Sequence, residues 1–167
     1  VTVSWSTKQD LAAGATGSLP AGITPTNFTM AFVVTVNSQP TDGFTMLNLA
    51  FKGDNGADAG YPVSFGVNSD GSLRFQVNSL AFDGTTGKVL TTGTHVVGAF
   101  VEYDGTKQKV NFSFDGSDYV SLGFTRNVWT NVEWSTYGAQ YTLPSFVDDV
   151  WFTFAEGQVA PEDLAAL

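Results

Sequence analysis

The chain has 167 residues, 43% of them hydrophobic, and its 14 Phe, 5 Tyr and 4 Trp can fill a sizeable core. This composition excludes disorder, and the length indicates a single domain over residues 1–167. The 16 acidic residues against 7 basic ones give a formal net charge of −9, which argues against nucleic acid and anionic membranes as partners, because both require basic surfaces. The absence of cysteine excludes disulfides and thiolate sites, and no apolar run reaches the roughly 18 residues of a membrane span, so no membrane insertion is expected.

Alternation of apolar and polar residues predicts β-strands along most of the chain, because successive side chains of a strand point to opposite faces of a sheet. The pattern is clearest in residues 28–36, 73–77 and 110–114. We expect the apolar set of these segments to face a core: Phe28, Met30, Phe32, Val34, Val36, Leu73, Phe75, Val77, Val110, Phe112 and Phe114.

Asp-Gly dipeptides separate the predicted strands and suit tight turns that need positive φ. They begin at Asp42, Asp70, Asp83, Asp104 and Asp115. Helix is expected only in the ending "APEDLAAL", where Pro161 takes a first-turn position and Glu162 and Asp163 follow it. The predicted fold class is all-β: a two-sheet antiparallel β-sandwich of about ten to twelve strands, with one short C-terminal helix.

Few residues offer catalytic chemistry. His95 is the only histidine, and no serine motif accompanies it, so a serine-triad hydrolase is not expected. Glu102 and Asp104 lie two residues apart, but Asp104 belongs to a turn dipeptide and no third carboxylate follows on that face. We therefore expect that the protein is not an enzyme.

Two acidic segments are candidates for binding calcium. The loop "KGDNGADAG" offers Asp54, Asn55 and Asp58 as oxygen ligands; the alternative is a solvated loop, because Asp/Asn/Gly runs also serve turns. In "FVDDVWF", Asp148 and Asp149 interrupt an apolar strand, where acidic side chains cost free energy unless paired, hydrogen-bonded or metal-bound. Asp148 is thus a further candidate ligand, and a structural calcium ion is the one cofactor that we consider.

Regular alternation also divides two strands rich in tryptophan. In "NVWTNVEW" it places Val128, Thr130, Val132 and Trp134 toward the core, and Trp129, Asn131 and Glu133 away from it. In "FVDDVWFTF" it places Phe146, Asp148, Val150, Phe152 and Phe154 toward the core, and Val147, Asp149, Trp151 and Thr153 away from it.

The outward residues of these two strands resemble a sugar-binding surface. Flat rings suit the C–H face of a carbohydrate, and carboxylate and amide groups suit its hydroxyls. The predicted site combines them with two tyrosines on a rim loop: Trp129, Asn131, Glu133, Tyr137, Tyr141, Asp149 and Trp151. The alternative is that the rings pack under loops or on a neighbouring chain, since Trp and Tyr also mark protein interfaces.

Longer stretches carry a family resemblance. The run "THVVGAFVEYDGTKQKVNFSFDGSDYVSLGF" resembles the centre of concanavalin A-like lectin/glucanase and laminin-G-like domains, in which a Tyr-Asp-Gly turn and an Asp-Gly turn end successive strands. The ending "FVDDVWFTFAEGQVAPEDLAAL" is similar to the closing strand and helix of that family, and "NFTMAFVVTVN" to its first core strand. The resemblance spans about residues 26–167 and implies a jelly roll of two curved sheets. It also implies a non-catalytic branch, because Lys107 stands where the last Glu of the glucanase pattern Glu-x-Asp-x-x-Glu would fall.

Two functions of different classes agree with these observations. One is a non-catalytic, lectin-like module of a larger secreted or surface protein, which binds a neutral polysaccharide or cell-surface glycan through exposed aromatics. The other is a structural or attachment domain of an adhesin, fibre or virion protein, whose rings pack on neighbouring subunits, as in a homo-oligomer. Both place the chain outside the cell or on a cell or virion surface. The N-terminus "VTVSWSTKQD" has neither a starting Met nor signal-peptide regions, so we expect a piece of a larger or processed precursor.

Overall fold

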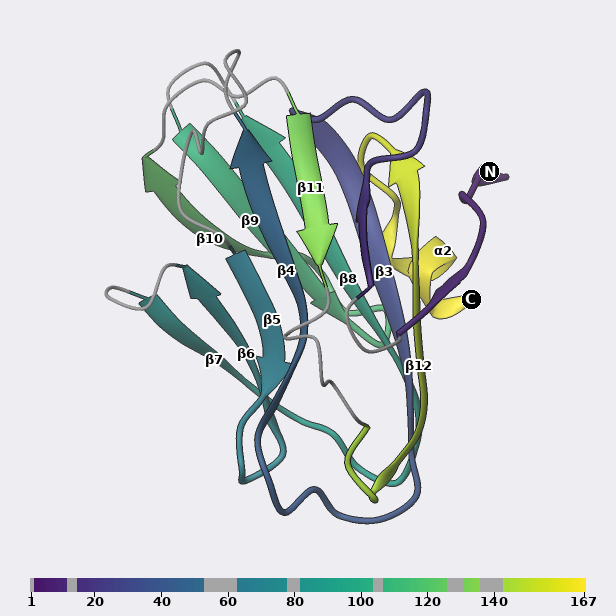
Figure 1. Cartoon of the computed structure of the whole chain (residues 1–167), viewed down its shortest axis with the longest axis vertical. Coiled ribbons are helices and arrows are strands. Elements are labelled where there is room, and N and C mark those ends of the chain that lie inside the picture. The colour runs from purple at the N-terminus through teal and green to yellow at the C-terminus, as the bar shows by residue number, and fades with distance from the viewer. Residues whose placement is uncertain are drawn as a thin grey trace.

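A computed structural model describes residues 2–11, 15–52, 63–77, 82–103, 107–125, 131–135 and 143–167, and these form two six-stranded antiparallel sheets (Figure 1). Sheet A has the strand order β1 (Gln9–Asp10), β12 (Val147–Glu156), β3 (Asn27–Val36), β8 (Gly93–Tyr103), β9 (Lys107–Phe114) and β10 (Val120–Thr125). Sheet B has the order β2 (Thr16–Ser18), β11 (Asn131–Ser135), β4 (Phe44–Lys52), β5 (Val63–Val67), β6 (Ser72–Val77) and β7 (Phe82–Val89). The predicted all-β sandwich is confirmed.

Aromatic and aliphatic side chains fill the space between the sheets. The predicted core set of β3 is buried throughout, with no member more than 2% exposed: Phe28, Met30, Phe32, Val34 and Val36. The ring of Phe32 lies 5.3 Å from that of Phe65 in sheet B, and Trp134 meets Phe152 edge-on at 5.0 Å. Because burial of one such side chain is worth about 1.5–3 kcal/mol, these contacts hold the sheets face to face.

The outer face of sheet A is covered by the chain itself. A second apolar cluster lies there, made of Ala31, Val33, Val96, Ala155, Val159 and Leu164. Part of its cover is helix α2 (Pro161–Ala165), which has Pro161 and two acidic residues in its first turn as predicted. Leu164 of α2 docks over Gly98 of β8, where a Cβ atom would clash with the Leu164 side chain. Glycine at position 98 therefore allows the helix to lie close to the sheet.

The N-terminal segment, defined here as residues 2–11, completes that cover along β12. Ser6 N donates to Phe154 O at 2.8 Å, Phe154 N donates to Ser6 Oγ at 2.9 Å, and Thr153 Oγ1 donates to Ser6 O at 2.7 Å. Further along, Lys8 Nζ lies 4.8 Å from the ring centroid of Trp151. Backbone and cation–π contacts thus tie this segment to the edge of sheet A.

Two of the predicted Asp-Gly turns are confirmed. Asp70-Gly71 joins β5 to β6, with a φ of 84° at Gly71. Asp115-Gly116 joins β9 to β10, with φ values of 51° and 82°. Asp42 lies in the loop before β4, and Asp104 lies outside the described residues.

The turn expected at Asp83-Gly84 is wrong. Both residues lie inside β7, where the ladder pairs Asp83 with Gln76 and Gly84 with Phe75 of β6. Pairing with a neighbouring strand supplies backbone hydrogen bonds over the length of β7, and it overrides the local turn preference of the dipeptide.

Alternation in β12 is interrupted at Asp148. Val147 pairs with Val36 and Asp149 pairs with Thr35, so Asp148 is the extra residue of a β-bulge. Asp148 is exposed, whereas Val147 is only 6% exposed and belongs to the core. The expectation that Asp148 shares the core face with Val150 is therefore wrong, and the bulge explains how an apolar strand accommodates the acidic pair.

Candidate functional site

Asn131 and Glu133 lie on the outer face of sheet B. Both are exposed, and they alternate along β11 with Val132 and Trp134, which are 0% and 9% exposed and belong to the core. The predicted alternation of this strand is confirmed over residues 131–134. Two polar members of the predicted site are therefore presented to solvent on one strand.

Trp151 and Asp149 lie on the opposite side of the molecule. They occupy the outer face of sheet A, where Trp151 is half-buried against the second apolar cluster and beneath Lys8. Since β11 and β12 belong to different sheets, the structure does not bring the two halves of the predicted sugar-binding surface together. Trp129, Tyr137 and Tyr141 lie outside the described residues, in segments that directly flank β11 in the sequence.

Of the candidate calcium ligands, the structure describes only Asp148. Asp148 Oδ1 accepts a hydrogen bond from Asn37 Nδ2 at 2.7 Å, while Asp54, Asn55 and Asp58 lie outside the described residues. Within the part of the chain that the structure describes, no three His, Cys, Asp or Glu side chains gather as a metal would require.

The contacts of His95 stabilise the fold. Its Nδ1 lies 2.7 Å from Asp115 Oδ2, its Nε2 lies 2.7 Å from the carbonyl oxygen of Thr91, and its ring stacks on Phe114 at 5.4 Å. Asp115 Oδ1 also accepts from Val96 N at 2.8 Å. With both ring nitrogens in hydrogen-bond contact and 8% of the residue exposed, His95 joins the turn between β9 and β10 to the start of β8.

One polar row crosses sheet B at a single register position. The ladder joins, strand by strand, Thr16, Ser135, Asn48, Ser64, Gln76 and Asp83. The next row along the strands consists of Gly17, Trp134, Leu49, Val63, Val77 and Phe82, and its member Trp134 faces the core. Because faces alternate along a strand, Thr16 of β2 and Ser135 of β11 lie on the outer face, opposite to Trp134.

At the β2 end of this polar row the surface is hollowed. A cavity of about 340 Å³, called here the face cavity, is lined by Thr16, Gly17, Ser18, Glu133, Trp134 and Ser135. Three hydroxyl side chains and one carboxylate surround it. Such a lining can bind several hydroxyl groups of one ligand in a fixed orientation.

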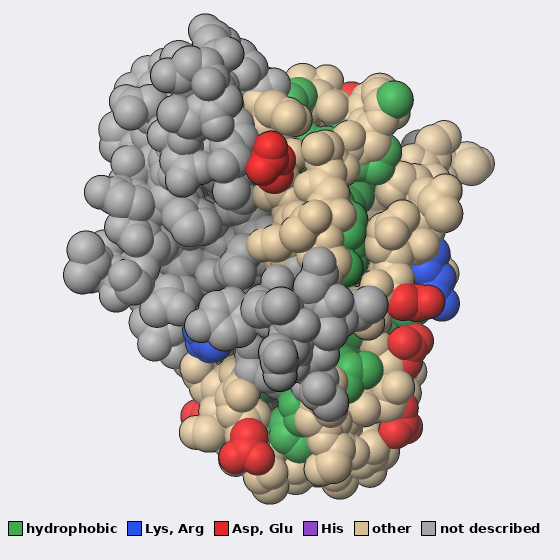
Figure 2. Space-filling view, in the orientation of Figure 1, with side chains coloured by type: hydrophobic (Ala, Val, Ile, Leu, Met, Phe, Trp, Pro, Cys, Tyr) green, Lys and Arg blue, Asp and Glu red, His purple; other side chains and the backbone are tan. Residues whose placement is uncertain are grey.

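A second cavity, called here the edge cavity, lies where sheet B faces the N-terminal segment. It has a volume of about 300 Å³ and is lined by Ser6, Thr7, Gln9, Ser18, Pro20, Trp134 and Phe154. Figure 2 shows hydrophobic side chains along a furrow between the β2 side of the molecule and the N-terminal segment. The edge cavity thus combines an apolar wall with polar side chains.

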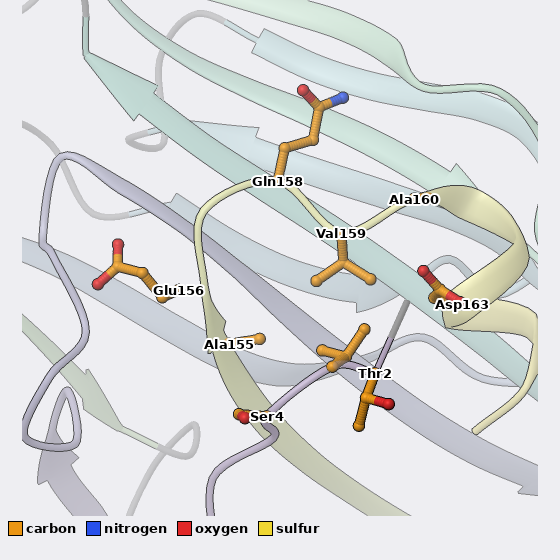
Figure 3. A pocket seen from close by; sticks show the side chains of 9 residues that line it. Thr2, Ser4, Ala155, Glu156, Gln158, Val159, Ala160 and Asp163 are labelled. Carbon is orange, nitrogen blue, oxygen red and sulfur yellow. The ribbon is translucent and has the colours of Figure 1, made fainter.

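A third cavity of about 330 Å³ lies on the other side of the N-terminal segment, against α2 (Figure 3). Glu156 and Asp163 both line it, but their side chains lie on opposite sides of the hollow in Figure 3 and do not converge. Glu156 Oε2 also accepts hydrogen bonds from Thr24 N and Thr24 Oγ1, each at 2.9 Å. The carboxylates of this cavity therefore form no shared binding group.

Sequence reasoning missed the residues of β2 and the N-terminal segment. Thr16 and Ser18 lie in a strand of three residues, "TGS", which contains no apolar side chain. Alternation between apolar and polar residues cannot reveal such a strand. The one local indication in the sequence was that the hydroxyl residues Thr16 and Ser18 are two positions apart, as on one face of a strand. Their place in the site depends on the pairing of β2 with β11.

Comparison with known proteins identifies the fold and leaves the family open. No sequence family matches this chain, and no curated protein does. Among solved structures, the Ruminococcus gnavus IT-sialidase CBM40 bound to α2,3-sialyllactose is similar with a TM-score of 0.53 and 10% identity, over 99% of this chain and 98% of that one. Domain 4 of AbnA, a GH43 extracellular arabinanase from Geobacillus stearothermophilus in complex with arabinotriose, gives a TM-score of 0.53 and 17% identity over 89% of this chain and 70% of that one.

An enzyme shares the architecture as well. Trypanosoma rangeli sialidase in complex with the inhibitor DANA gives a TM-score of 0.52 and 16% identity over 85% of this chain, which spans only 22% of the sialidase. At identities this low, the similarity establishes the β-sandwich fold alone, so the laminin-G-like branch stays a prediction. Among the described residues, no helix is long and apolar enough to cross a membrane.

Proposed function

We propose that this chain is a non-catalytic, lectin-like carbohydrate-binding module whose glycan site is the outer face of sheet B around the face cavity. The observation that carries the proposal is the face cavity, where the hydroxyls of Thr16, Ser18 and Ser135 and the carboxylate of Glu133 gather on two neighbouring strands. Hydroxyl, amide and carboxylate groups are the partners that sugar hydroxyls require.

The asymmetry of the two sheets supports this choice of face. Sheet A is covered by α2 and the N-terminal segment, which bury apolar side chains against it. The described outer residues of β2 and β11, in contrast, are polar. The net charge of −9 favours a neutral glycan over an anionic one, and two similar structures were solved with saccharides bound.

The proposal keeps three of the aromatic residues predicted to stack on sugar. Trp129, Tyr137 and Tyr141 flank β11 in the sequence, and we propose that they border the glycan surface, as ring contacts with a sugar C–H face require. Trp151 and Asp149 are outside the proposed site, because they lie on the other sheet. A structural calcium ion at Asp54, Asn55 and Asp58 remains part of the proposal, as does a parent protein that is secreted or on a surface.

Binding is tested with a neutral-glycan array followed by calorimetry. Thr16→Ala and Glu133→Gln should each weaken binding about threefold to tenfold, since a hydrogen bond is worth about 0.5–1.5 kcal/mol. Asp149→Ala, folded by circular dichroism, should bind as the unchanged protein does. If Asp149→Ala loses binding while Thr16→Ala keeps it, the glycan binds to sheet A instead.

Absence of catalysis is tested separately. Incubation with β-glucans, xylans and galactans should release no reducing ends, because the chain lacks the third carboxylate of the glucanase pattern. Steady release that Glu102→Gln abolishes would show that the protein is an enzyme.

A structural or attachment role is the second candidate, and one observation favours it. Among the described strands β10 ends sheet A, and its first residue, Val120, is 60% exposed; a strand at the edge of a sheet is a surface on which a neighbouring chain can pair. Mass measurement in solution separates the two functions. A monomer supports the glycan-binding module, and a trimer or larger assembly supports the attachment domain.

A further inference from the structure

The face cavity and the edge cavity adjoin each other across β2. Ser18 and Trp134 line both of them, whereas Thr16 and Glu133 line only the first, and Thr7 and Gln9 line only the second. Each volume, about 340 and 300 Å³, is at the lower end of the range for small-ligand sites, roughly 300–1,000 Å³. Each cavity therefore suits one small ring, and together they form a path over the edge of sheet B.

The chemistry of the edge cavity matches a neutral sugar ring. None of its seven lining residues is charged, and Trp134, Phe154 and Pro20 supply apolar surface. Thr7, Gln9 and Ser18 supply polar side chains, and within the described part of the chain no hydrogen bond occupies these side chains. The Ser6 hydroxyl, by contrast, accepts a hydrogen bond from Phe154 N, and this bond holds Ser6 against β12 in the wall of the cavity.

The indole of Trp134 also favours a ligand that carries hydroxyl groups. The residue is 9% exposed; its ring lies 5.0 Å from that of Phe152 and close to Gly17, where an added Cβ would clash with it. Among the described residues, nothing accepts a hydrogen bond from its Nε1–H. Because a buried indole N–H usually has an acceptor, the common wall of the two cavities has a donor available for a ligand oxygen.

We propose that the bound glycan is an oligosaccharide of at least two neutral sugar units that crosses the edge of sheet B, with one unit in the face cavity and the next in the edge cavity. This inference rests on the proposed function. Ser18 and Trp134 contact both units at the linkage, and Gln9 and Thr7 bind only the second. The N-terminal segment is thus part of the binding site as well as the cover of sheet A.

The experiment measures affinity against chain length. Calorimetry is performed with gluco-, xylo- and arabino-oligosaccharides of one to four units, on the unchanged protein and on three variants: Thr16→Ala, the double variant Thr7→Ala/Gln9→Ala, and Gln158→Ala. Gln158 is a matched control, since it is an exposed glutamine of the third cavity. Affinity should rise at least tenfold from one unit to two and little afterwards.

The variants then assign the units to the cavities. Thr7→Ala/Gln9→Ala should lower affinity for the two-unit sugar at least tenfold and leave any one-unit binding unchanged, while Thr16→Ala lowers both and Gln158→Ala lowers neither. The indole N–H resonance of Trp134, assigned from Trp134→Phe, should shift on addition of the two-unit sugar.

Equal affinity for one and two units, or full two-unit affinity in Thr7→Ala/Gln9→Ala, overturns the inference and leaves a site confined to the face cavity. Absence of binding to every sugar on both the array and the series is a different outcome, because it overturns the proposed function itself.

Discussion

Trp134 stands where the core of the sandwich meets both cavities. Its replacement by alanine removes the edge-on contact with Phe152 and leaves a void between the sheets, so Trp134→Ala should lower the free energy of unfolding by about 3–5 kcal/mol. Asn131→Ala, on the exposed side of the same strand, should change it by less than about 0.5 kcal/mol. Urea titration followed by circular dichroism measures both. Equal stability of the two variants would contradict the assignment of faces in β11.

Tyr119 links the stability of the protein to alkaline pH. Its hydroxyl donates to Val159 O at 2.7 Å, and burial raises the pKa of Tyr119 to about 12. The unfolded chain ionises this residue near its ordinary pKa of about 10, so the folded state holds its proton more tightly. The contribution of Tyr119 is fully present below pH 10 and is lost as the pH rises from 10 to 12.

The measurement compares the unchanged protein with Tyr119→Phe between pH 8 and 12. The difference in unfolding free energy should be constant up to about pH 10 and should shrink above it, because phenylalanine does not titrate. Parallel curves over the whole range would show that Tyr119 ionises equally in both states.

At the scale of elements, the docking of α2 depends on a single missing side chain. A Cβ at Gly98 would clash with Leu164, and Leu164 is only 1% exposed, so it has little room to move. Gly98→Ala should therefore destabilise the protein by roughly 1–3 kcal/mol. In a Leu164→Ala background the same substitution should cost at least 1 kcal/mol less, since the clash is gone. An unchanged cost in that background would mean that the strain arises elsewhere.

The whole molecule has two outer faces with different roles. The outer face of sheet A behaves as a second core, and the outer face of sheet B meets solvent at β2 and β11. Val96→Lys, at a position 8% exposed beneath the cover of sheet A, should destabilise the protein by several kcal/mol, because it buries an unpaired charge. Ser135→Lys, on sheet B, should stay within about 0.5 kcal/mol. Thermal unfolding of the two variants checks the asymmetry, and similar melting temperatures would refute it.

Local sequence patterns were sufficient to predict much of this architecture. Alternation identified the core residues of β3, β9 and β11, Asp-Gly dipeptides located the turns at positions 70 and 115, and Pro161 marked the start of α2. These features were readable because each depends on the periodicity of a strand or on the backbone preference of one or two residues.

Only the tertiary structure decided which strands share a sheet. The sequence determined that Trp134 faces inward and that Trp151 does not share the core face, but it contains no local signal that β11 and β12 belong to opposite sheets. Pairing between strands far apart in the chain is fixed by how all apolar faces bury together, so β11 lies beside β2, and β12 beside β1 and β3. That pairing separates Glu133 from Trp151, and it brings Ser18 and Gln9 to the two sides of one cavity.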